Sequence, residues 1–380
     1  MIDPSTIPLG LYIHFPWCVR KCPYCDFNSH EAPQKIPATQ YIHALLADLQ
    51  QDAFALAGRP ISTVFMGGGT PSLMPGHDIA HLLNTLRQHY NLREDAEITL
   101  EANPGAVERQ YFTDYVAAGV NRFSLGVQSF QPEQLKRLGR IHNPDDIWRA
   151  IELIQHLGVS RLNIDIMYGL PEQTPAAAED DLHKALSCNP GHLSWYQLTL
   201  EPNTVFYQYP PPLPPDETLG DIEAAGAAIL GAHGYAQYEI SAWCQPGHAS
   251  QHNQIYWAFN DYIGIGAGAH GKLTTPDGLI RTTRTRVPQH YLKHIQGGRQ
   301  YRVIEPEALP FEFMLNALRL REGLPQSAWI DRTGLSLAAL EPQLSQLRQR
   351  GLMHPERLAL SAQGWLFYND VVAEFLGETT

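Results

Sequence analysis

The chain has 380 residues, of which 44% are hydrophobic and 17% charged, and this composition excludes an intrinsically disordered chain. Its formal net charge of −12 disfavours nucleic acid or anionic lipid as a broad electrostatic partner, because both are negatively charged as well. No apolar run approaches the roughly 20 residues of a membrane span and residues 1–10 lack the features of a targeting segment, so we expect a cytoplasmic protein.

Six short segments in the first half of the chain have the pattern of buried strands, and helical patterns separate them. The strands are expected at 11–15, 63–66, 97–101, 122–127, 161–167 and 193–200, and the helices at 38–57, 78–90, 107–118, 132–157 and 178–188. Strands that alternate with helices indicate βαβ units and a parallel sheet. Six consecutive units predict an α/β fold, a partial (β/α)6 TIM-like barrel rather than a closed eightfold one.

The pattern changes after the sixth strand. A proline-rich spacer at 209–215 precedes a helix near 217–233, strands near 238–241 and 262–265, and a hairpin of 272–275 with 279–283. From about 308 the chain is expected to be mainly helical, with a helix over 336–350 and a strand-like segment at 358–360. We therefore predict a barrel core at 1–205, a barrel-completing, aromatic-rich extension at 206–305 and a winged-helix-like C-terminal domain at 306–380.

Three of the five cysteines lie within eight residues, at Cys18, Cys22 and Cys25. This spacing is atypical of a disulfide framework and favours a metal site in a reducing compartment. Three thiolates on one loop can hold three irons of a 4Fe–4S cluster and leave the fourth iron open for a ligand. The alternative is a structural zinc site, for which His14 or His30 would supply the fourth ligand.

Polar residues follow the predicted strands at the end where barrel enzymes place their sites. Gly68, Gly69 and Thr70 follow the second strand, and Glu101 ends the third. Gln128 ends the fourth strand, Arg140 lies beyond it, and Asp165 lies near the end of the fifth. Each of these residues by itself could equally be a helix cap or a hydrogen-bonded strand-end group. Their order after a cysteine loop favours a common site.

A Cys-x3-Cys-x2-Cys loop after the first strand of a partial barrel resembles the radical S-adenosylmethionine (SAM) superfamily. In that superfamily the open iron binds the methionine part of SAM, and electron transfer generates a 5′-deoxyadenosyl radical. Together with Tyr196-Gln-Leu-Thr-Leu-Glu-Pro202 and the C-terminal domain, the motifs are similar to one branch over nearly the whole chain. That branch contains oxygen-independent coproporphyrinogen III dehydrogenase and related heme chaperones.

The resemblance implies a set of SAM-binding residues. Those that match contacts of the cluster-bound SAM are Tyr12, Gly68, Glu101 and, in a loose alignment, His270. Those that match contacts of a second SAM are Tyr24, Gly69, Thr70, Gln128, Arg140, Asp165 and, again loosely, Thr199.

Two departures from the dehydrogenase favour the heme chaperones of this branch. Phe27 occupies the position of a fourth cysteine, and about ten residues precede the first strand where the dehydrogenase has a long segment. The resemblance then implies heme as a further ligand, heme-accepting respiratory membrane proteins as recipients, an electron donor and a homodimer. No catalytic residue is assigned, and whether the protein is also an enzyme stays open.

His252, Tyr256 and Trp257 are the heme-binding candidates, because a porphyrin requires flat apolar neighbours and an axial ligand. The alternative is that these three residues pack under the edge of the barrel and that His252 forms ordinary hydrogen bonds. Two other functions remain as alternatives: oxidative decarboxylation of coproporphyrinogen III, and a zinc-stabilised barrel without redox chemistry.

Overall fold

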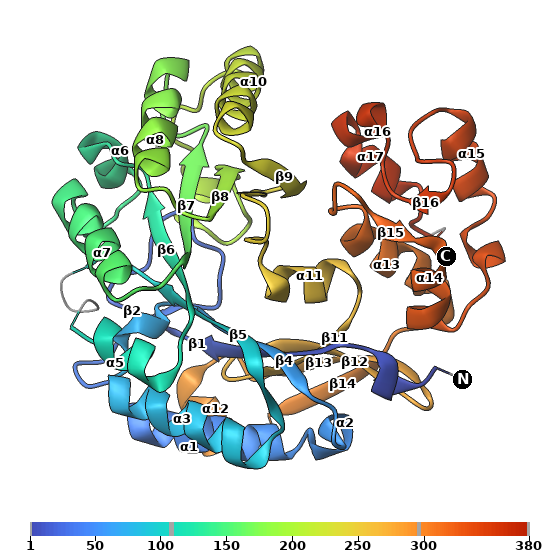
Figure 1. Ribbon diagram of the computed structural model, residues 1–380, viewed down its shortest axis with the longest axis horizontal. Coiled ribbons are helices and arrows are strands. Elements are labelled where there is room, and N and C mark those ends of the chain that lie inside the picture. Colours follow the sequence, from blue (N-terminus) through green and yellow to red (C-terminus); the bar gives the residue numbers. More distant parts are fainter. Residues whose placement is uncertain (1, 106–109, 295–297, 378–380) are drawn as a thin grey trace.

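One curved sheet of 12 strands organises the computed structural model, which describes residues 2–105, 110–294 and 298–377 (Figure 1). Six parallel strands form its centre, each within a few residues of the expected position. They are, in sheet order, β1 (Leu9–Phe15), β4 (Ile61–Gly68), β5 (Leu92–Ala102), β6 (Arg122–Gln128), β7 (Arg161–Tyr168) and β8 (His192–Gln197). Most of their residues are buried, as expected for parallel strands that are covered on both faces.

The segment after residue 205 extends this sheet on both sides. β11 (Asp261–Ile265) pairs in parallel with β1, with Leu11 opposite Ile263, and so supplies a seventh parallel strand. Antiparallel strands follow β11 on one side and β8 on the other. They are β12 (His270–Thr275), β13 (Gly278–Arg284) and β14 (Arg299–Val303) beside β11, and β10 (Ala242–Cys244) and β9 (Ala236–Glu239) beside β8. In the described chain β14 and β9 stand at the two ends of the strand order and do not pair with each other, so the barrel is partial.

Helices surround the sheet on its outer side (Figure 1). They are α1 (Ala38–Gln50), α2 (Ala53–Leu56), α3 (Gly76–His89), α5 (Phe112–Ala118), α6 (Pro132–Arg137), α7 (Pro144–His156), α8 (Pro175–Ser187), α10 (Asp216–Ala232) and α12 (Pro288–Lys293). The apolar stripe of α3 is fully buried at Ile79, Leu82, Leu83 and Leu86. Two further short helices, α9 (Val205–Gln208) and α11 (Gln251–Trp257), precede and follow α10 in the chain.

Three expected helices differ from those observed. The helix predicted over 132–157 is divided into α6 and α7, because Gly139 has a left-handed φ of 67° and Asn143 starts a new helix with a capping box to Asp146. The helix predicted over 38–57 is likewise two helices, α1 and α2. The helix predicted over 107–118 begins at Phe112, and residues 107–109 lie outside the described residues.

The C-terminal part forms a separate helical unit at one side of the barrel, with α11 between them (orange to red in Figure 1). Its elements are α13 (Leu309–Ala317), β15 (Leu324–Pro325), α14 (Gln326–Thr333), α15 (Gln343–Gln349), β16 (Arg357–Leu358), α16 (Ala362–Leu366) and α17 (Tyr368–Ala373). The two short strands pair antiparallel, with Leu324 opposite Leu358; the winged-helix-like arrangement of this unit stays a prediction.

The helix predicted over 336–350 is wrong in its first half. A 3-10 turn, Leu337–Leu340, precedes α15, and Pro342 separates them. Proline has no N–H for the helical ladder, so the longer helix is interrupted there. Within the described residues, no helix combines the length and the apolar character needed to span a bilayer.

Candidate functional site

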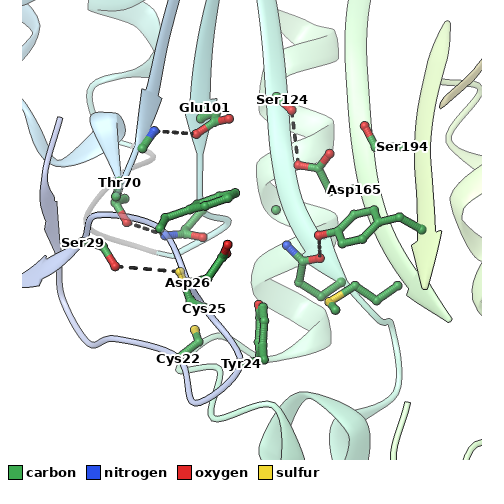
Figure 2. Close-up of a pocket in the computed structure, with 18 of the residues that line it drawn as sticks. Cys22, Tyr24, Cys25, Asp26, Ser29, Thr70, Glu101, Ser124, Asp165 and Ser194 are labelled. Carbon is green, nitrogen blue, oxygen red and sulfur yellow. Dashed lines mark hydrogen bonds between the residues drawn. The ribbon is translucent and has the colours of Figure 1, made fainter. Parts of the chain in front are cut away.

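A cavity of about 480 Å³ lies at the carboxyl ends of the parallel strands, and all three clustered cysteines line it. Cys18 ends β2 (Trp17–Cys18), a short strand that pairs with β3 (His30–Glu31), and Cys22 and Cys25 follow in the loop between them. The three thiols are half-buried and free of disulfides. Figure 2 shows Cys22 and Cys25 on this loop, next to the strand ends that carry Glu101 and Asp165.

The glycine turn after β4 holds the base of this loop. The backbone N–H groups of Gly69 and Thr70 donate to the carbonyls of Phe15 and Trp17 at 2.7 Å each. A Cβ on Gly69 would lie 2.6 Å from the Trp17 carbonyl oxygen, so a larger residue would push the two loops apart. Gly68 has φ of 111°, a backbone conformation that favours glycine. The turn therefore fixes where the cysteine loop leaves the first strand.

Each cysteine has a polar neighbour that can donate a hydrogen bond to a thiolate. Arg140 Nη1 lies 3.7 Å from Cys22 Sγ, and the Ser29 hydroxyl lies 3.8 Å from Cys25 Sγ. Burial raises the pKa of the Cys18 thiol, and a hydrogen bond from the Thr70 side chain opposes this shift. Such donors stabilise negative charge on sulfur, so the surroundings fit thiolate ligands of an iron–sulfur cluster.

The two histidines near the cysteines differ in whether a ring nitrogen is free to bind a metal. The ring of His14 is engaged at both nitrogens, by the Tyr12 hydroxyl at 3.0 Å and by the Asn28 carbonyl at 2.9 Å. His30 has a buried Nε2 for which the described chain shows no hydrogen-bond partner. Among the described residues, no group of three or more His, Cys, Asp or Glu side chains is compact enough to hold one metal ion.

Two half-buried carboxyl groups, those of Glu101 on β5 and Asp165 on β7, line the cavity from strands on either side of β6. Glu101 Oε2 accepts a hydrogen bond of 3.0 Å from the Gly68 N–H. Burial, reinforced by the charge of Asp165, raises the pKa of Glu101 to about 8. Burial also raises the pKa of Asp165, although Ser124 and Asn163 donate to it at 3.2 and 2.7 Å. A cation in the cavity would stabilise the ionised forms of both carboxyl groups and so lower their pKa values.

A second group of polar residues in the cavity wall is formed by Gln128, Arg140, Asn103 and Tyr196. Gln128 has a left-handed φ of 69°, and its side-chain oxygen accepts 2.8 Å from the Tyr196 hydroxyl. Arg140 Nη2 donates to the Gly126 carbonyl at 2.7 Å and to Asn103 Oδ1 at 2.5 Å. The guanidinium thus supplies positive charge within reach of the cysteine loop.

The structure brings most of the expected SAM contacts into this one cavity. Its wall includes Tyr24, Gly68, Gly69, Thr70, Glu101, Gln128, Arg140, Asp165 and the loosely aligned Thr199. The wall residues that sequence reasoning missed include Asn103, Ser124 and Tyr196. Asn103 and Tyr196 also lie at strand ends, which is the signal that could have found them.

A second cavity of about 550 Å³ adjoins the first and shares part of its wall, including Gly68, Glu101 and Trp257. Tyr12, His270 and Tyr256 face this second cavity. His252 lines neither cavity and is fully buried. Its Nδ1 lies 2.7 Å from the Thr63 hydroxyl and its Nε2 lies 2.8 Å from the Tyr256 hydroxyl. Among the heme candidates, the structure thus brings Tyr256 and Trp257 to a cavity and leaves His252 behind them.

Two family models match the chain. The model described as the radical SAM superfamily matches residues 12–185, and the model described as the HemN C-terminal domain matches residues 304–367. A solved structure, coproporphyrinogen III oxidase (HemN) from Escherichia coli, is 25% identical, covers 98% of this chain and 91% of its own, and superposes with a TM-score of 0.82.

Full-length relatives are more similar in sequence. Heme chaperone HemW of Escherichia coli (strain K12) is 49% identical over 98% of this chain and 99% of its own length. Heme chaperone HemW of Haemophilus influenzae is 44% identical, over 99% and 100% of the two chains, and that of Bacillus subtilis is 35% identical, over 97% and 99%. The chain therefore belongs to the radical SAM superfamily and, within it, to the family of heme chaperone HemW.

Proposed function

We propose that the protein is a heme chaperone that binds heme, holds a 4Fe–4S cluster together with SAM, and transfers heme to respiratory haemoproteins. The observation that carries this proposal is identity of 35–49% over nearly the whole length of relatives that are named heme chaperone HemW. The cavity at the cysteine loop, the two family models and the HemN-like fold support the same assignment.

Cys18, Cys22 and Cys25 would hold the cluster. Three half-buried thiols that face one cavity fit a cubane with three protein ligands, and the open iron would then face the cavity. With SAM at that iron, the cluster supplies one-electron cleavage of a carbon–sulfur bond. The hydrogen-bond donors beside Cys22 and Cys25 would stabilise the added electron.

The charges around the cavity support SAM as its ligand. SAM carries a sulfonium, an ammonium and a carboxylate group. Glu101 and Asp165 would pair with the cationic groups, and Arg140 would bind a carboxylate. The Gly68 and Gly69 turn would let the methionine part approach the backbone closely, and Tyr24, Thr70, Gln128 and Tyr12 would complete the contacts.

The heme proposal keeps Tyr256 and Trp257 as contacts and changes the role of His252. Both ring nitrogens of His252 form hydrogen bonds away from either cavity. We therefore propose that His252 supports Tyr256 through a hydrogen bond and does not bind the heme iron.

The partners follow from the family resemblance. The recipients would be heme-accepting respiratory membrane proteins, and an electron donor would reduce the cluster. The exposed Val19 and Arg20 on the cysteine loop offer that donor a surface next to the thiols. We also propose that the protein forms a homodimer. It would be located in the cytoplasm and contact membranes through its recipients. The domain boundaries at 205 and 305 are part of the same proposal.

Coproporphyrinogen III dehydrogenation is the second candidate, favoured by the HemN-like fold over 98% of the chain. The exposed Phe27 at the position of the fourth cysteine of that enzyme argues against it.

An anaerobic comparison separates the candidates. Protein reconstituted with iron and sulfide is assayed for brown cluster absorbance, hemin retention, turnover of coproporphyrinogen III, and hemin transfer to a heme-free respiratory haemoprotein. We expect a cluster, retained hemin and hemin transfer without turnover. Turnover without retained hemin would instead identify the dehydrogenase. A colourless protein that retains zinc would contradict both redox functions.

A further inference from the structure

The second cavity, called the slot from here on, has several aromatic side chains in its wall. Tyr12, Phe27, Tyr256, Trp257 and Tyr262 contribute rings to its lining. The rings of Tyr256 and Tyr262 meet edge to face at 4.5 Å between centroids, which holds both in fixed orientations. A volume of about 550 Å³ lies within the range of about 300–1,000 Å³ that is typical of cofactor sites. The slot therefore suits a flat, largely apolar ligand.

Most side chains that could coordinate iron in this slot are already engaged. The His14 ring is bonded at both nitrogens, and the Tyr12 hydroxyl is one of its two partners. The Tyr256 hydroxyl is bound to His252 at 2.8 Å. In the same way, Arg281 donates to the Tyr262 hydroxyl at 2.8 Å. Coordination by any of these would break an existing hydrogen bond.

His270 differs from them because its ring has no hydrogen bond to any residue that the structure describes, and it is exposed at the slot. It is the first residue of β12, where it pairs with Thr283 of β13. A Cβ on Gly264 would lie 1.8 Å from the His270 carbonyl oxygen, so the close approach of β11 fixes its backbone. Partial desolvation, with the charges of Arg281 and Arg286, lowers the pKa of His270 and favours the neutral imidazole that can coordinate iron.

The charges of the slot are unequally distributed. Its acidic residues, Asp26 and Glu101, lie in the wall that it shares with the cluster cavity. Arg286 lines the slot but not the cluster cavity, is exposed, and has no carboxylate partner within the described chain. The carboxylate side chains of a ligand are therefore favoured at the Arg286 end and disfavoured at the cluster end.

We propose that this slot is the heme site, with His270 Nε2 or Nδ1 as the axial ligand and Arg286 paired with a propionate. The proposal rests on the proposed heme-chaperone function and adds the location of the ligand. It places the porphyrin between β1, β12 and α11, next to the cavity that would hold SAM. Asn316 of α13 also lines the slot, so the C-terminal unit closes one side of it.

Hemin titration of the anaerobic full-length protein tests this site. The His270→Ala variant is expected to lose the histidine-ligated ferric absorbance and EPR signature and to bind hemin at least about tenfold more weakly. Added imidazole should restore the signature. The matched control is His77→Ala, which removes a histidine side chain that is 79% exposed on α3, and it should behave like the unchanged protein.

A second variant tests the propionate contact. Arg286→Gln should weaken hemin severalfold and leave the affinity for hemin dimethyl ester, which has no carboxylates, unchanged. The slot is not the heme site if His270→Ala keeps the spectrum and affinity of the unchanged protein. It is also not the heme site if His252→Gln removes the ligand signature while His270→Ala keeps it. In both cases the heme-chaperone proposal survives. Failure of the unchanged protein to bind any hemin would overturn that proposal together with the site.

Discussion

The five cysteines of this chain occupy two kinds of surroundings. Cys18, Cys22 and Cys25 are half-buried, face a cavity and have hydrogen-bond donors nearby. Cys188 and Cys244 are buried, and burial raises the pKa of each thiol to about 11. A thiol that is held neutral in this way is a poor metal ligand, since metals bind the thiolate.

Replacing any one of Cys18, Cys22 or Cys25 with Ala should abolish the 4Fe–4S cluster, because two thiolates cannot hold the cubane. Iron and sulfide analysis after anaerobic reconstitution measures this. Cys188→Ala is the control and should keep its full iron content. Full iron and sulfide in any of the three loop variants would mean that the ligand set is wrong.

Glu101 should make the stability of the cluster-free protein depend on pH. Its pKa is about 8 in the fold against 4.5 for a free carboxyl, so the folded protein binds the proton more tightly. This stabilisation is complete below about pH 4.5 and is lost as the pH rises through about 8. Glu101→Gln, which resembles the protonated form, should remove it. The variant should therefore be more stable than the unchanged protein at pH 9, on the order of a few kcal/mol, and equally stable at pH 4.5.

Denaturant unfolding at the two pH values measures this difference. Equal stability of the two proteins at pH 9 would contradict the raised pKa of Glu101. In the reconstituted protein the same substitution should weaken SAM binding and leave the iron content unchanged, because Glu101 faces the cavity without contacting a cysteine.

At the scale of elements, the short helix α11 depends on a carboxylate from the barrel. Glu97 of β5 accepts from the backbone N–H groups of Gln251 and His252 at 3.2 and 3.0 Å, at the helix N-terminus. It also pairs with Arg161 at 2.8 Å. A helix of seven residues is not stable by itself, so these bonds help to hold Tyr256 and Trp257 at the second cavity.

Glu97→Gln should destabilise the protein by about 3–5 kcal/mol, because it removes the charge that balances buried arginines. It should also increase hydrogen exchange at the amides of residues 251–257. The exposed Glu94 on the same strand offers a control, and Glu94→Gln should change neither measurement. Unchanged exchange in the Glu97 variant would show that α11 is held by packing instead.

At the scale of the whole molecule, apolar and polar contacts join the barrel to the C-terminal unit. The hydrophobic core of that unit includes Phe259 and Leu279 from the preceding segment. Arg319 and Arg321 extend the edge of the sheet at β9, since the Arg319 carbonyl accepts from Ile240 and the Arg321 N–H donates to Tyr238. The Arg319 side chain pairs with buried Glu239 at 3.1 Å and lies 4.3 Å over the Trp257 ring.

Arg319→Gln should lower the free energy of unfolding by about 3 kcal/mol, because Glu239 is left buried without its cation. Cluster content should stay unchanged, since the side-chain partners of Arg319 include Glu239, Ser241 and Trp257 and none of them lies on the cysteine loop. Arg350→Gln breaks a surface pair with Glu374 and should cost less than about 1 kcal/mol. Equal effects of the two substitutions, measured by denaturant unfolding, would show that Arg319 does not join the two parts.

The sequence by itself determined the parallel strands, the cysteine loop and most of the polar residues around the cluster cavity. These follow from local patterns, and the carboxyl ends of parallel strands necessarily converge at one edge. Tertiary structure decided the rest: that His252 is buried against Thr63 of β4, 189 residues earlier in the chain, and that His270 and Arg286 reach an aromatic slot. It also decided that the loop with Arg140 breaks a predicted helix to reach Cys22. Local periodicity carries no information on such hydrogen bonds, because their partners come from strands far apart in the chain.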